Sequence, residues 1–484
     1  MKKIISFFAF LAMAAACGVL PLSAKGKKAK APKYVFYLIT DGTGVNTVLG
    51  TEYYRAQCEG RLGTKPLCMT SFPVVGVATT YSTSSDVTDS AASGTALATG
   101  TKTYNSGLGV CPDSVTPAIS VAQRAHDAGY AVGIGTSVPV NHATPAAQYA
   151  HAKTRAMLWQ ITRQLFETEF EFFGGSLISL QRAYTDEAHI DTLNQWAAEH
   201  GYTITRGLEQ YEREGKTAER VVMLQSIDVP DTYSLPYWID RKPGQMTIVD
   251  ELRAEIDFLY AKSQQKGCKG FFLMNEVGGK VDFSCHARDG ATAFNEVLAV
   301  DSCVKVAYEF YLKHPDETLI VVTADHETGG LTLGCNPHGY KINTGVLQYQ
   351  RASKDEASRH LVALRVATGN KVSWEQVQGV LREDFGFWDK VEITADEEQS
   401  LQDVYKRSFE GKMPSEKNLY SETEPLAALA VGIMNDKAHL GWTSSGHTAG
   451  LVPVYACGVG QELFMSHNDN AQIPRNIARI LKLD

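Results

Sequence analysis

Residues 34–44 read YVFYLITDGTG, an unbroken apolar run that leads into an aspartate and two glycines. A short apolar run bounded by turn residues is typical of a strand buried on both faces of a parallel sheet. Asp41 then stands at the carboxyl end of that strand. Open α/β sheets hold their ligands at this end, so Asp41 is the first candidate for a functional site.

Two further runs repeat the pattern. Residues 271–274 (FFLM) lead to Glu276, and residues 319–322 (LIVV) lead to Asp325 and His326. Between them a helical spacing of apolar residues predicts a βαβ unit, with Ala293, Val297, Val300, Val304, Ala307 and Tyr311 on one face. The 484 residues, 44% of them hydrophobic, suffice for one large core. We therefore predict an α/β fold with a doubly wound, mostly parallel sheet flanked by helices.

Carboxylates and imidazoles gather at these predicted strand ends. Carboxylate oxygen and imidazole nitrogen form the ligand set of hydrolytic zinc sites, and six such groups suffice for two zinc ions with open positions. Taken singly, an aspartate after a strand is more often a turn or helix cap, and a lone histidine is more often a hydrogen-bonded surface group. The six candidates are Asp41, Asp282, His286, Asp325, His326 and His447.

Residues 89–93 (DSAAS) precede the small-residue run GTALATG. Thr88 or Asp89 can cap a helix that begins here, which places the Ser90 hydroxyl where backbone N–H groups and the helix dipole favour an anion. A phosphoryl group could be received at that position. An Asp-Ser pair before an alanine-rich stretch is more often a plain helix cap, so this segment needs support from the rest of the chain.

Together these motifs resemble the alkaline phosphatase family. The segments DSAAS, Asp282-x-x-x-His286, VTADH (322–326) and SGHTAG (445–450) occur in the family's order, and the resemblance covers roughly residues 33–335 and 440–484. It implies hydrolysis of phosphate monoesters through a phosphoserine at Ser90, with inorganic phosphate as product. It also implies two zinc ions, the first held by Asp282, His286 and His447 and the second by Asp41, Asp325 and His326.

The segment 142–147 (HATPAA) extends the resemblance to a third metal, a magnesium ion. Thr144 corresponds to a hydroxyl ligand of that metal, and Arg155 corresponds to the arginine that clamps two phosphate oxygens. A planar guanidinium suits this bidentate role better than lysine does. His142 stands where animal members carry histidine, and with Asp89 it belongs to the environment of the substrate or the third site.

The glutamate of the third site departs from the family pattern. Val277 occupies the family's position, and Glu276 lies one residue earlier. We predict that Glu276 still serves the third metal with Asp41 and Thr144, because Gly278 and its neighbour would let Val277 be an inserted loop residue. The alternative is a third site built from His142 without a glutamate.

The first residues predict export. A basic start precedes the apolar run IISFFAFLAMAAA, which is too short for a comfortable membrane span, so we expect a signal peptide at 1–24 and a basic leader at 25–33. The product would be periplasmic or secreted. Lipid anchoring at Cys17 is less favoured, because Ala14 suits lipoprotein processing poorly.

The composition limits the possible partners. Loss of Lys2 and Lys3 with the signal peptide takes the formal charge from −8 to −10, which leaves no basic surface for nucleic acid, and no later segment is apolar enough to span a membrane. Of the eight remaining cysteines, Cys58 and Cys68 are the favoured disulfide pair. The family resemblance makes a homodimer possible.

About 120 residues separate His326 from His447, more than simple bacterial members of the family carry. We expect a helical insertion at about 337–438 within the catalytic domain 34–484. Capping boxes that begin at Ser373 and Thr394 mark two of its helices.

Two alternatives remain at this stage. One is a phosphodiesterase of the same superfamily, although diesterases usually lack the arginine and the third-metal segment that Arg155 and residues 142–147 supply. The other is a protein that binds zinc or phosphate without turnover. A sulfatase is disfavoured, because Ser90 lacks the C/S-x-P-x-R setting.

Overall fold

The structure is a computed structural model that describes residues 30–228, 233–409, 411, 413–417 and 419–483. The predicted signal peptide, Cys17 and most of the basic leader lie outside the described residues. No helix within the described part is long and apolar enough to cross a membrane.

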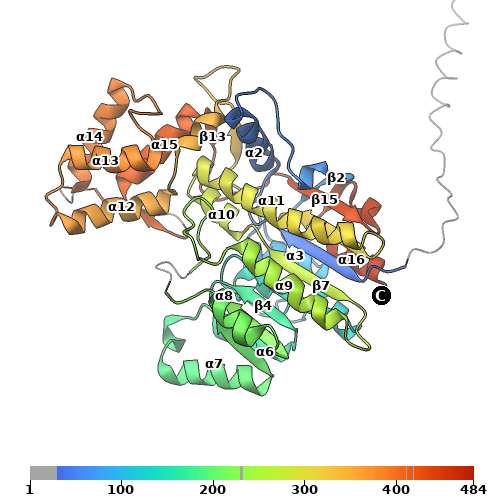
Figure 1. Ribbon diagram of the computed structural model, residues 1–484. Helices are drawn as coiled ribbons and strands as arrows, with labels where there is room; N and C mark the ends of the chain where they lie inside the picture. The colour runs from blue at the N-terminus through green and yellow to red at the C-terminus, as the bar shows by residue number, and fades with distance from the viewer. Residues whose placement is uncertain (1–29, 229–232, 410, 412, 418, 484) are drawn as a thin grey trace, which may run out of the picture. The chain divides into compact units, whose positions relative to one another are not determined.

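A ten-stranded sheet forms the centre of the fold (Figure 1), in the order β16-β2-β15-β8-β1-β7-β3-β4-β6-β5. All neighbouring pairs are parallel except those of β15, which runs antiparallel to β2 and β8. The predicted doubly wound, mostly parallel sheet is therefore confirmed. Its strands are β1 Tyr34–Ile39, β2 Val74–Thr79, β3 Ala131–Thr136, β4 Phe172–Gly175, β5 Tyr202–Arg206, β6 Arg220–Leu224, β7 Phe271–Glu276, β8 Thr318–Thr323, β15 Val452–Gly458 and β16 Ser466–Asp469.

Helices cover both faces of the sheet. Successive side chains of a strand point to opposite faces, so Tyr37 of β1 packs toward one helical layer and Phe36 toward the other, and both are fully buried. One layer contains α3 Ser90–Thr99, α4 Val121–Asp127, α5 Ala143–Ala146, α6 Leu158–Glu167, α7 Glu187–Glu199 and α16 Gln472–Leu481. The other contains α2 Val45–Cys58, α9 Ile248–Ser263, α10 Gly279–His286 and α11 Gly290–Lys313, and α8 Gly207–Gln210 follows β5. Helix α11 is the predicted crossover between the strands that end in Glu276 and Thr323.

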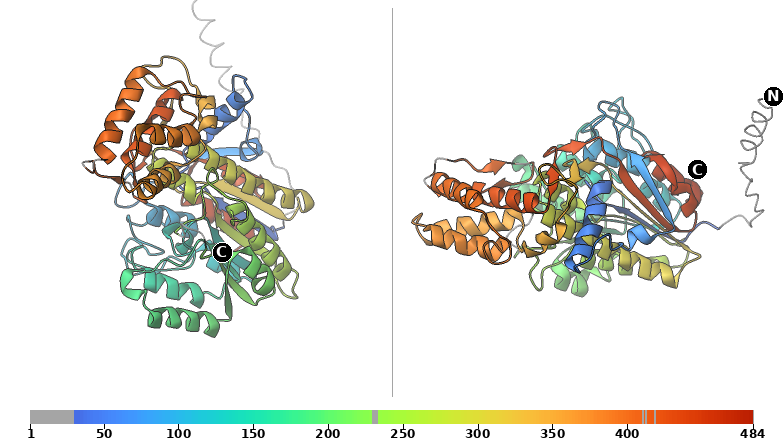
Figure 2. Two further views of the ribbon diagram at one scale, coloured as in Figure 1. Left: turned by 60° about the vertical axis from the view of Figure 1, so that its left-hand side comes forward. Right: turned by 90° about the horizontal axis from the view of Figure 1, so that it is seen from above.

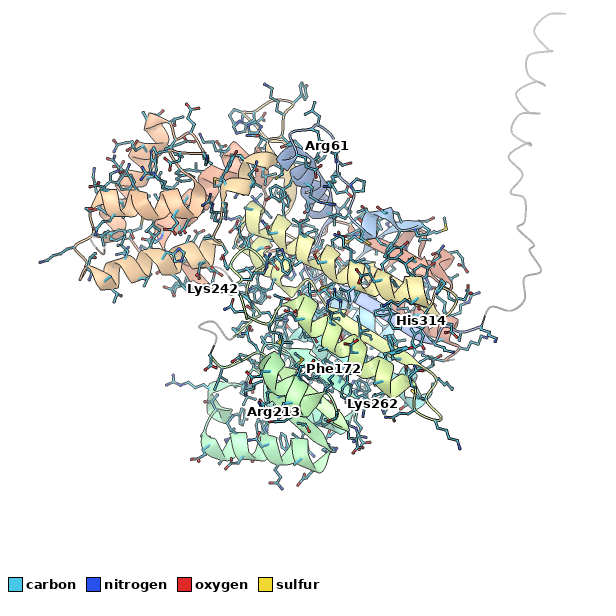
Figure 3. All side chains as sticks on the ribbon, in the orientation of Figure 1. Arg61, Phe172, Arg213, Lys242, Lys262 and His314 are labelled. Atoms are coloured by element: carbon cyan, nitrogen blue, oxygen red, sulfur yellow. The ribbon has the colours of Figure 1, made fainter. Side chains whose placement is uncertain are left out.

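Figure 3 contrasts the inside of this layered arrangement with its surface. Phe172 of β4 is fully buried, and its ring lies 5.8 Å from that of Phe258 on α9. Arg61, Arg213 and Lys242 are exposed. Apolar strands and charged outer surfaces thus follow the pattern expected of a sheet buried on both faces.

Four helices between β10 and β13 form a separate apolar cluster, which lies to one side of the sheet in Figures 1 and 2. The predicted capping boxes are present: Ser373 and Thr394 each accept from the backbone three residues ahead and are capped in return. Phe385 and Phe387 fill the cluster and are fully buried. The helices are α12 Lys354–Ala367, α13 Trp374–Phe385, α14 Ala395–Phe409 and α15 Pro425–Lys437. Their status as an insertion relative to other family members stays a prediction.

Short strands complete the secondary structure. They form three antiparallel pairs: β9 Glu327–Thr328 with β14 His447–Thr448, β10 Leu331–Leu333 with β13 Leu440–Trp442, and β11 Glu416–Lys417 with β12 Glu422–Thr423.

The expected disulfide between Cys58 and Cys68 is absent, and all eight cysteines among the described residues are free thiols. Cys58 ends α2 beside Tyr54. Cys68 instead packs against the apolar cluster on the face of the sheet to which Phe36 points. The short intervening loop therefore does not bring the two thiols together.

Candidate active site

Three adjacent parallel strands bring the first candidate ligands together. In the order β7-β1-β8, Leu38 lies beside Asn275 and Ile39 lies beside Thr323, so all three strands end at the same level. Glu276 ends β7, Asp41 follows β1 by two residues, and Asp325 follows β8 by two. The carboxyl edge of the sheet thus concentrates carboxylates at one place, as expected for an open α/β sheet.

His447 reaches the same edge from the opposite chain direction. Strand β15 is antiparallel to β8, with Val454 beside Thr323, so the beginning of β15 lies at the carboxyl end of β8. Strand β14 precedes β15 and pairs His447 with Thr328. This one reversed strand therefore delivers an imidazole to a site otherwise built from parallel strand ends.

Helix α10 supplies two further ligand candidates. Asp282 and His286 are four residues apart and so share one helix face, with Nε2 of His286 3.4 Å from Oδ1 of Asp282. The turn after β1 comes close to this helix: a Cβ atom on Gly42 would lie 2.7 Å from Cα of Asp282, and Gly42 has φ +71°. Only glycine fits this turn without strain, and the turn places Asp41 beside α10.

The first cluster comprises Asp282, His286 and His447. Nδ1 of His286 lies 2.6 Å from the carbonyl of Ser445, and Nδ1 of His447 lies 2.8 Å from the carbonyl of Thr88. A carbonyl only accepts, so both Nδ1 atoms carry protons. The two Nε2 atoms lie 3.2 Å apart, and when both rings are neutral their lone pairs face each other, an arrangement that a shared cation would stabilise.

The second cluster comprises Asp41, Asp325 and His326, all with side chains fully buried. Nε2 of His326 lies 3.2 Å from Oδ1 of Asp41 and 3.3 Å from Oδ2 of Asp325. Thr328 donates its hydroxyl to Asp282 at 2.6 Å and lies 3.1 Å from Nδ1 of His326. Its oxygen can accept a hydrogen bond from Nδ1–H, in which case the lone pair of the neutral ring is on Nε2, beside the carboxylates.

Burial shifts the protonation of this cluster. It raises the pKa of Asp41 well above its ordinary value, with the nearby Asp325 adding to the effect, and it raises the pKa of Asp325 itself. It also lowers the pKa of His326. Burial favours neutral groups, so it keeps His326 in the neutral form that binds metal, whereas the two carboxyl groups resist ionisation unless a cation compensates their charge.

Two buried carboxylate oxygens, Oδ1 of Asp41 and Oδ2 of Asp282, have no hydrogen-bond partner among the described residues. Burial alone would raise the pKa of Asp282, but the imidazoles of His286 and His447 hold it below its ordinary value. Unsatisfied buried oxygens beside imidazole lone pairs fit a divalent cation, and the mixed oxygen and nitrogen set fits zinc.

A third cluster contains Asp41, His142 and Glu276, whose ligand atoms lie within 4.8 Å of one another. Thr144 donates to Oδ2 of Asp41 at 3.5 Å, and Thr136 donates to Glu276. The second oxygen of Glu276 has no hydrogen-bond partner among the described residues, and burial raises the pKa of this glutamate to about 7. The arrangement also fits a cation at this third position.

The structure places Glu276 at the end of β7 and Val277 in the turn that follows, as predicted. The status of Val277 as an insertion relative to other family members stays a prediction. Strand β7 runs regularly through Glu276, which pairs with Thr136 of β3. Val277 is 2% exposed and joins the apolar cluster on the opposite face, together with Leu273. Glu276 therefore belongs to the third cluster from the last position of the strand, while Val277 joins the apolar core from the turn.

His142 and Arg155 contact each other at the edge of the site. Nη2 of Arg155 lies 2.9 Å from Nε2 of His142, and Nη1 lies 3.7 Å from Oδ2 of Asp89. A guanidinium only donates, so Nε2 of His142 is the acceptor and its single proton resides on Nδ1. Burial, with Arg155 nearby, lowers the pKa of His142 to about 3. In this arrangement His142 orients Arg155.

Ser90 is the first residue of α3 and is fully buried. Of the two expected caps, Asp89 is the one used, and it accepts from the backbone N–H of Ala92 at 3.0 Å. The hydroxyl of Ser90 lies 3.2 Å from Nε2 of His326. The candidate nucleophile therefore lies beside the second cluster, at the positive end of a helix dipole.

Sequence reasoning missed several residues at the site. Thr328 and Thr136 orient ligand side chains, and nothing in their sequence context distinguishes them from other strand-end threonines. Tyr420 also lies here, with its ring centroid 5.2 Å from that of His286. It comes from the helical segment, far along the chain from the motifs that drew attention to the site.

This fold and these clusters define a metal-dependent hydrolase. A family model described as alkaline phosphatase matches residues 32–168 and 230–483. The chain belongs to the alkaline phosphatase family, whose members are phosphoric monoester hydrolases.

Individual relatives agree with this assignment. The chain is 28% identical over 476 residues to alkaline phosphatase 4 of Bacillus subtilis (strain 168), a match that covers 95% of this chain and 91% of that protein. The crystal structure of the cold-active alkaline phosphatase from the psychrophile Shewanella sp. matches with a TM-score of 0.76 and 27% identity, covering 93% of this chain and 99% of that one. That of Thermus thermophilus alkaline phosphatase has a TM-score of 0.74 and 26% identity, covering 94% and 92%.

The shared position of Asp41 leads to a test of the clusters. Asp41 belongs to the second and third clusters, whereas His447 belongs only to the first. Asp41→Ala should therefore lose the metal of two clusters and His447→Ala the metal of one, measured by mass spectrometry after dialysis against trace zinc and magnesium. Asp257→Ala, at an exposed position on α9, should keep all of it. Equal losses in the Asp41 and His447 variants would contradict the shared role of Asp41.

Proposed function

We propose that the protein is a periplasmic or secreted alkaline phosphatase that hydrolyses small phosphate monoesters through a phosphoserine at Ser90. The observation that carries this proposal is the place of the Ser90 hydroxyl, 3.2 Å from Nε2 of His326 at the first turn of α3. A serine hydroxyl is a weak nucleophile at its free pKa, and a neighbouring metal site is one established way to activate it.

We further propose two zinc ions and one magnesium ion as cofactors. Asp282, His286 and His447 would hold the first zinc and Asp41, Asp325 and His326 the second, since both sets combine oxygen and nitrogen. Asp41, Glu276 and Thr144 offer only oxygen, the ligand type that magnesium prefers. When bound, these cations supply Lewis-acid activation of oxygen nucleophiles and stabilise negative charge on leaving oxygens.

In the proposed reaction Ser90 is the nucleophile and Arg155 binds the phosphoryl group. Oγ of Ser90 attacks phosphorus, so a bond from Oγ to phosphorus forms, the bond to the ester oxygen breaks, and the alcohol departs. Water then attacks the phosphoserine, the Oγ bond breaks, and inorganic phosphate leaves. Arg155 would donate to two non-bridging oxygens, while contacts with His142 and Asp89 hold its guanidinium in place.

The two alternative functions make different demands on these residues. The diester substrate of a phosphodiesterase has fewer non-bridging phosphate oxygens that an arginine could bind in a bidentate way. A protein that only binds zinc or phosphate has no need of a serine hydroxyl beside the second cluster. Arg155 and Ser90 therefore favour a phosphomonoesterase and also provide its tests.

The remaining proposals concern the setting of the enzyme. We propose export because residues 1–24 have the pattern of a signal peptide. We propose a homodimer because of the family resemblance. Nucleic acid is not proposed as a partner, because the formal charge of the chain is −8.

Ser90→Ala should abolish the covalent intermediate and lower kcat/KM for p-nitrophenyl phosphate on the order of 10³-fold, because the nucleophile is lost while the metal clusters remain. Acid quenching with labelled phosphate should mark Ser90 in the wild type and leave the variant unlabelled. Ser400→Ala, at an exposed position on α14, should keep the label. Label on a residue other than Ser90 would refute the assignment.

Arg155→Ala should lower kcat/KM for p-nitrophenyl phosphate on the order of 10²- to 10³-fold, because two charge-assisted hydrogen bonds to the phosphoryl group are lost. Hydrolysis of bis(p-nitrophenyl) phosphate should fall much less. The exposed Arg163 of α6 provides a matched control, and Arg163→Ala should change neither rate. An equal loss on both substrates would count against the phosphomonoesterase.

A further inference from the structure

A cavity of about 400 Å³ opens beside Arg155 and His142. This volume lies within the range of roughly 300–1,000 Å³ that is usual for small-molecule sites. Asn141 and Ser179 add two further polar side chains to its lining. The remaining wall is largely apolar or aromatic and includes Leu158, Tyr233, Leu419 and Tyr420.

Tyr420 reaches this cavity from the segment between β11 and β12. Its ring stacks on Phe283, with centroids 3.7 Å apart and planes at 20°. Phe283 lies in α10 directly after Asp282, and the ring of His142 lies 6.3 Å from that of Tyr420. An aromatic side chain from the helical segment therefore lies against the helix that carries two metal-ligand candidates.

Strands β11 and β12 form a hairpin, which makes two ion pairs with neighbouring segments. Glu416 of β11 lies 3.2 Å from Arg288, just after α10, and 3.0 Å from the nearly buried Lys354 at the start of α12. The hairpin thus contacts α10 and the helical segment, but partly exposed ion pairs contribute little stability, so the stacking of Tyr420 on Phe283 is the main contact that positions the ring.

The chemistry of the wall indicates what it would bind. Tyr233 adds a second ring to the wall, and the planes of Tyr233 and Tyr420 lie at 19° and 20° to that of Phe283, at centroid distances of 6.3 and 3.7 Å. Arg155 is the one charged side chain that lines the cavity among the described residues. Aromatic and aliphatic surface beside a single guanidinium suits a planar apolar group attached to a phosphate.

We propose that Tyr420 is a specificity-determining residue that selects phosphate monoesters whose organic group carries an aromatic ring. This inference rests on the proposed function, since it assigns the cavity to the organic part of the ester held at Ser90. The ring of Tyr420, with Tyr233 on the same wall, receives the substrate ring.

The test compares benzyl phosphate with ethyl phosphate, because both release a primary alcohol and they differ mainly in the ring. Tyr420→Ala should reduce the benzyl-to-ethyl ratio of kcat/KM about tenfold, as expected for a lost aromatic contact together with its buried area. Tyr420→Phe should keep the ratio. Lys417→Ala, an exposed change on the same hairpin, is the matched control and should also keep it.

Binding of benzylphosphonate and methylphosphonate, measured by calorimetry, separates this inference from the proposed function because neither compound is hydrolysed. Tyr420→Ala should weaken benzylphosphonate about tenfold and leave methylphosphonate unchanged, even if no ester is turned over. Tyr233→Ala, which leaves the hairpin intact, should weaken benzylphosphonate as well. An unchanged preference in Tyr420→Ala, an equal loss for both ligands, or a loss in Tyr420→Phe as large as in Tyr420→Ala would overturn the proposal.

Discussion

The crowding of buried carboxylates at the carboxyl edge of the sheet is the constraint on which the site depends. Asp41, Asp325 and Glu276 end three adjacent strands, and burial raises the pKa of each. Together with Asp282 they place more negative charge in one low-dielectric space than it can hold unaided. Bound metal ions would supply the compensation, and the charge that opposes folding without metal would then form the ligand set. The sheet is the scaffold that forces this proximity.

Hydrogen bonds behind the ligands connect this metal chemistry to the nucleophile. His447 directs its outer nitrogen to the carbonyl of Thr88, two residues before Ser90, so the ring of a zinc-ligand candidate and the start of α3 hold each other in place. Thr328 bridges Asp282 and His326 and thereby links the first cluster to the second. Such outer contacts set the ring orientation and the tautomer of each imidazole. These hydrogen bonds therefore connect both clusters to each other and to the start of the helix that carries Ser90.

The amino-acid sequence predicts the parts of this site that follow from regular periodicity. Apolar runs that end in Asp41 or Asp325 indicate parallel strands and place their ligands, and the cap before Ser90 follows from residue type. Glu276 is predictable as the last residue of its strand with Val277 in the turn behind it, because Gly278 and Gly279 follow directly. Tyr420 had no local signal. Its position depends on the stack with Phe283, a contact between segments distant in sequence that local sequence pattern does not contain.

The central claim is that the clustered ligands at the strand ends hold zinc beside the nucleophile. Anomalous diffraction from crystals grown with zinc, recorded on both sides of the zinc absorption edge, tests it most directly. The account predicts one strong peak among Asp282, His286 and His447, and another among Asp41, Asp325 and His326, on the side that faces Ser90. Zinc peaks confined to surface histidines, with neither cluster occupied, would contradict it.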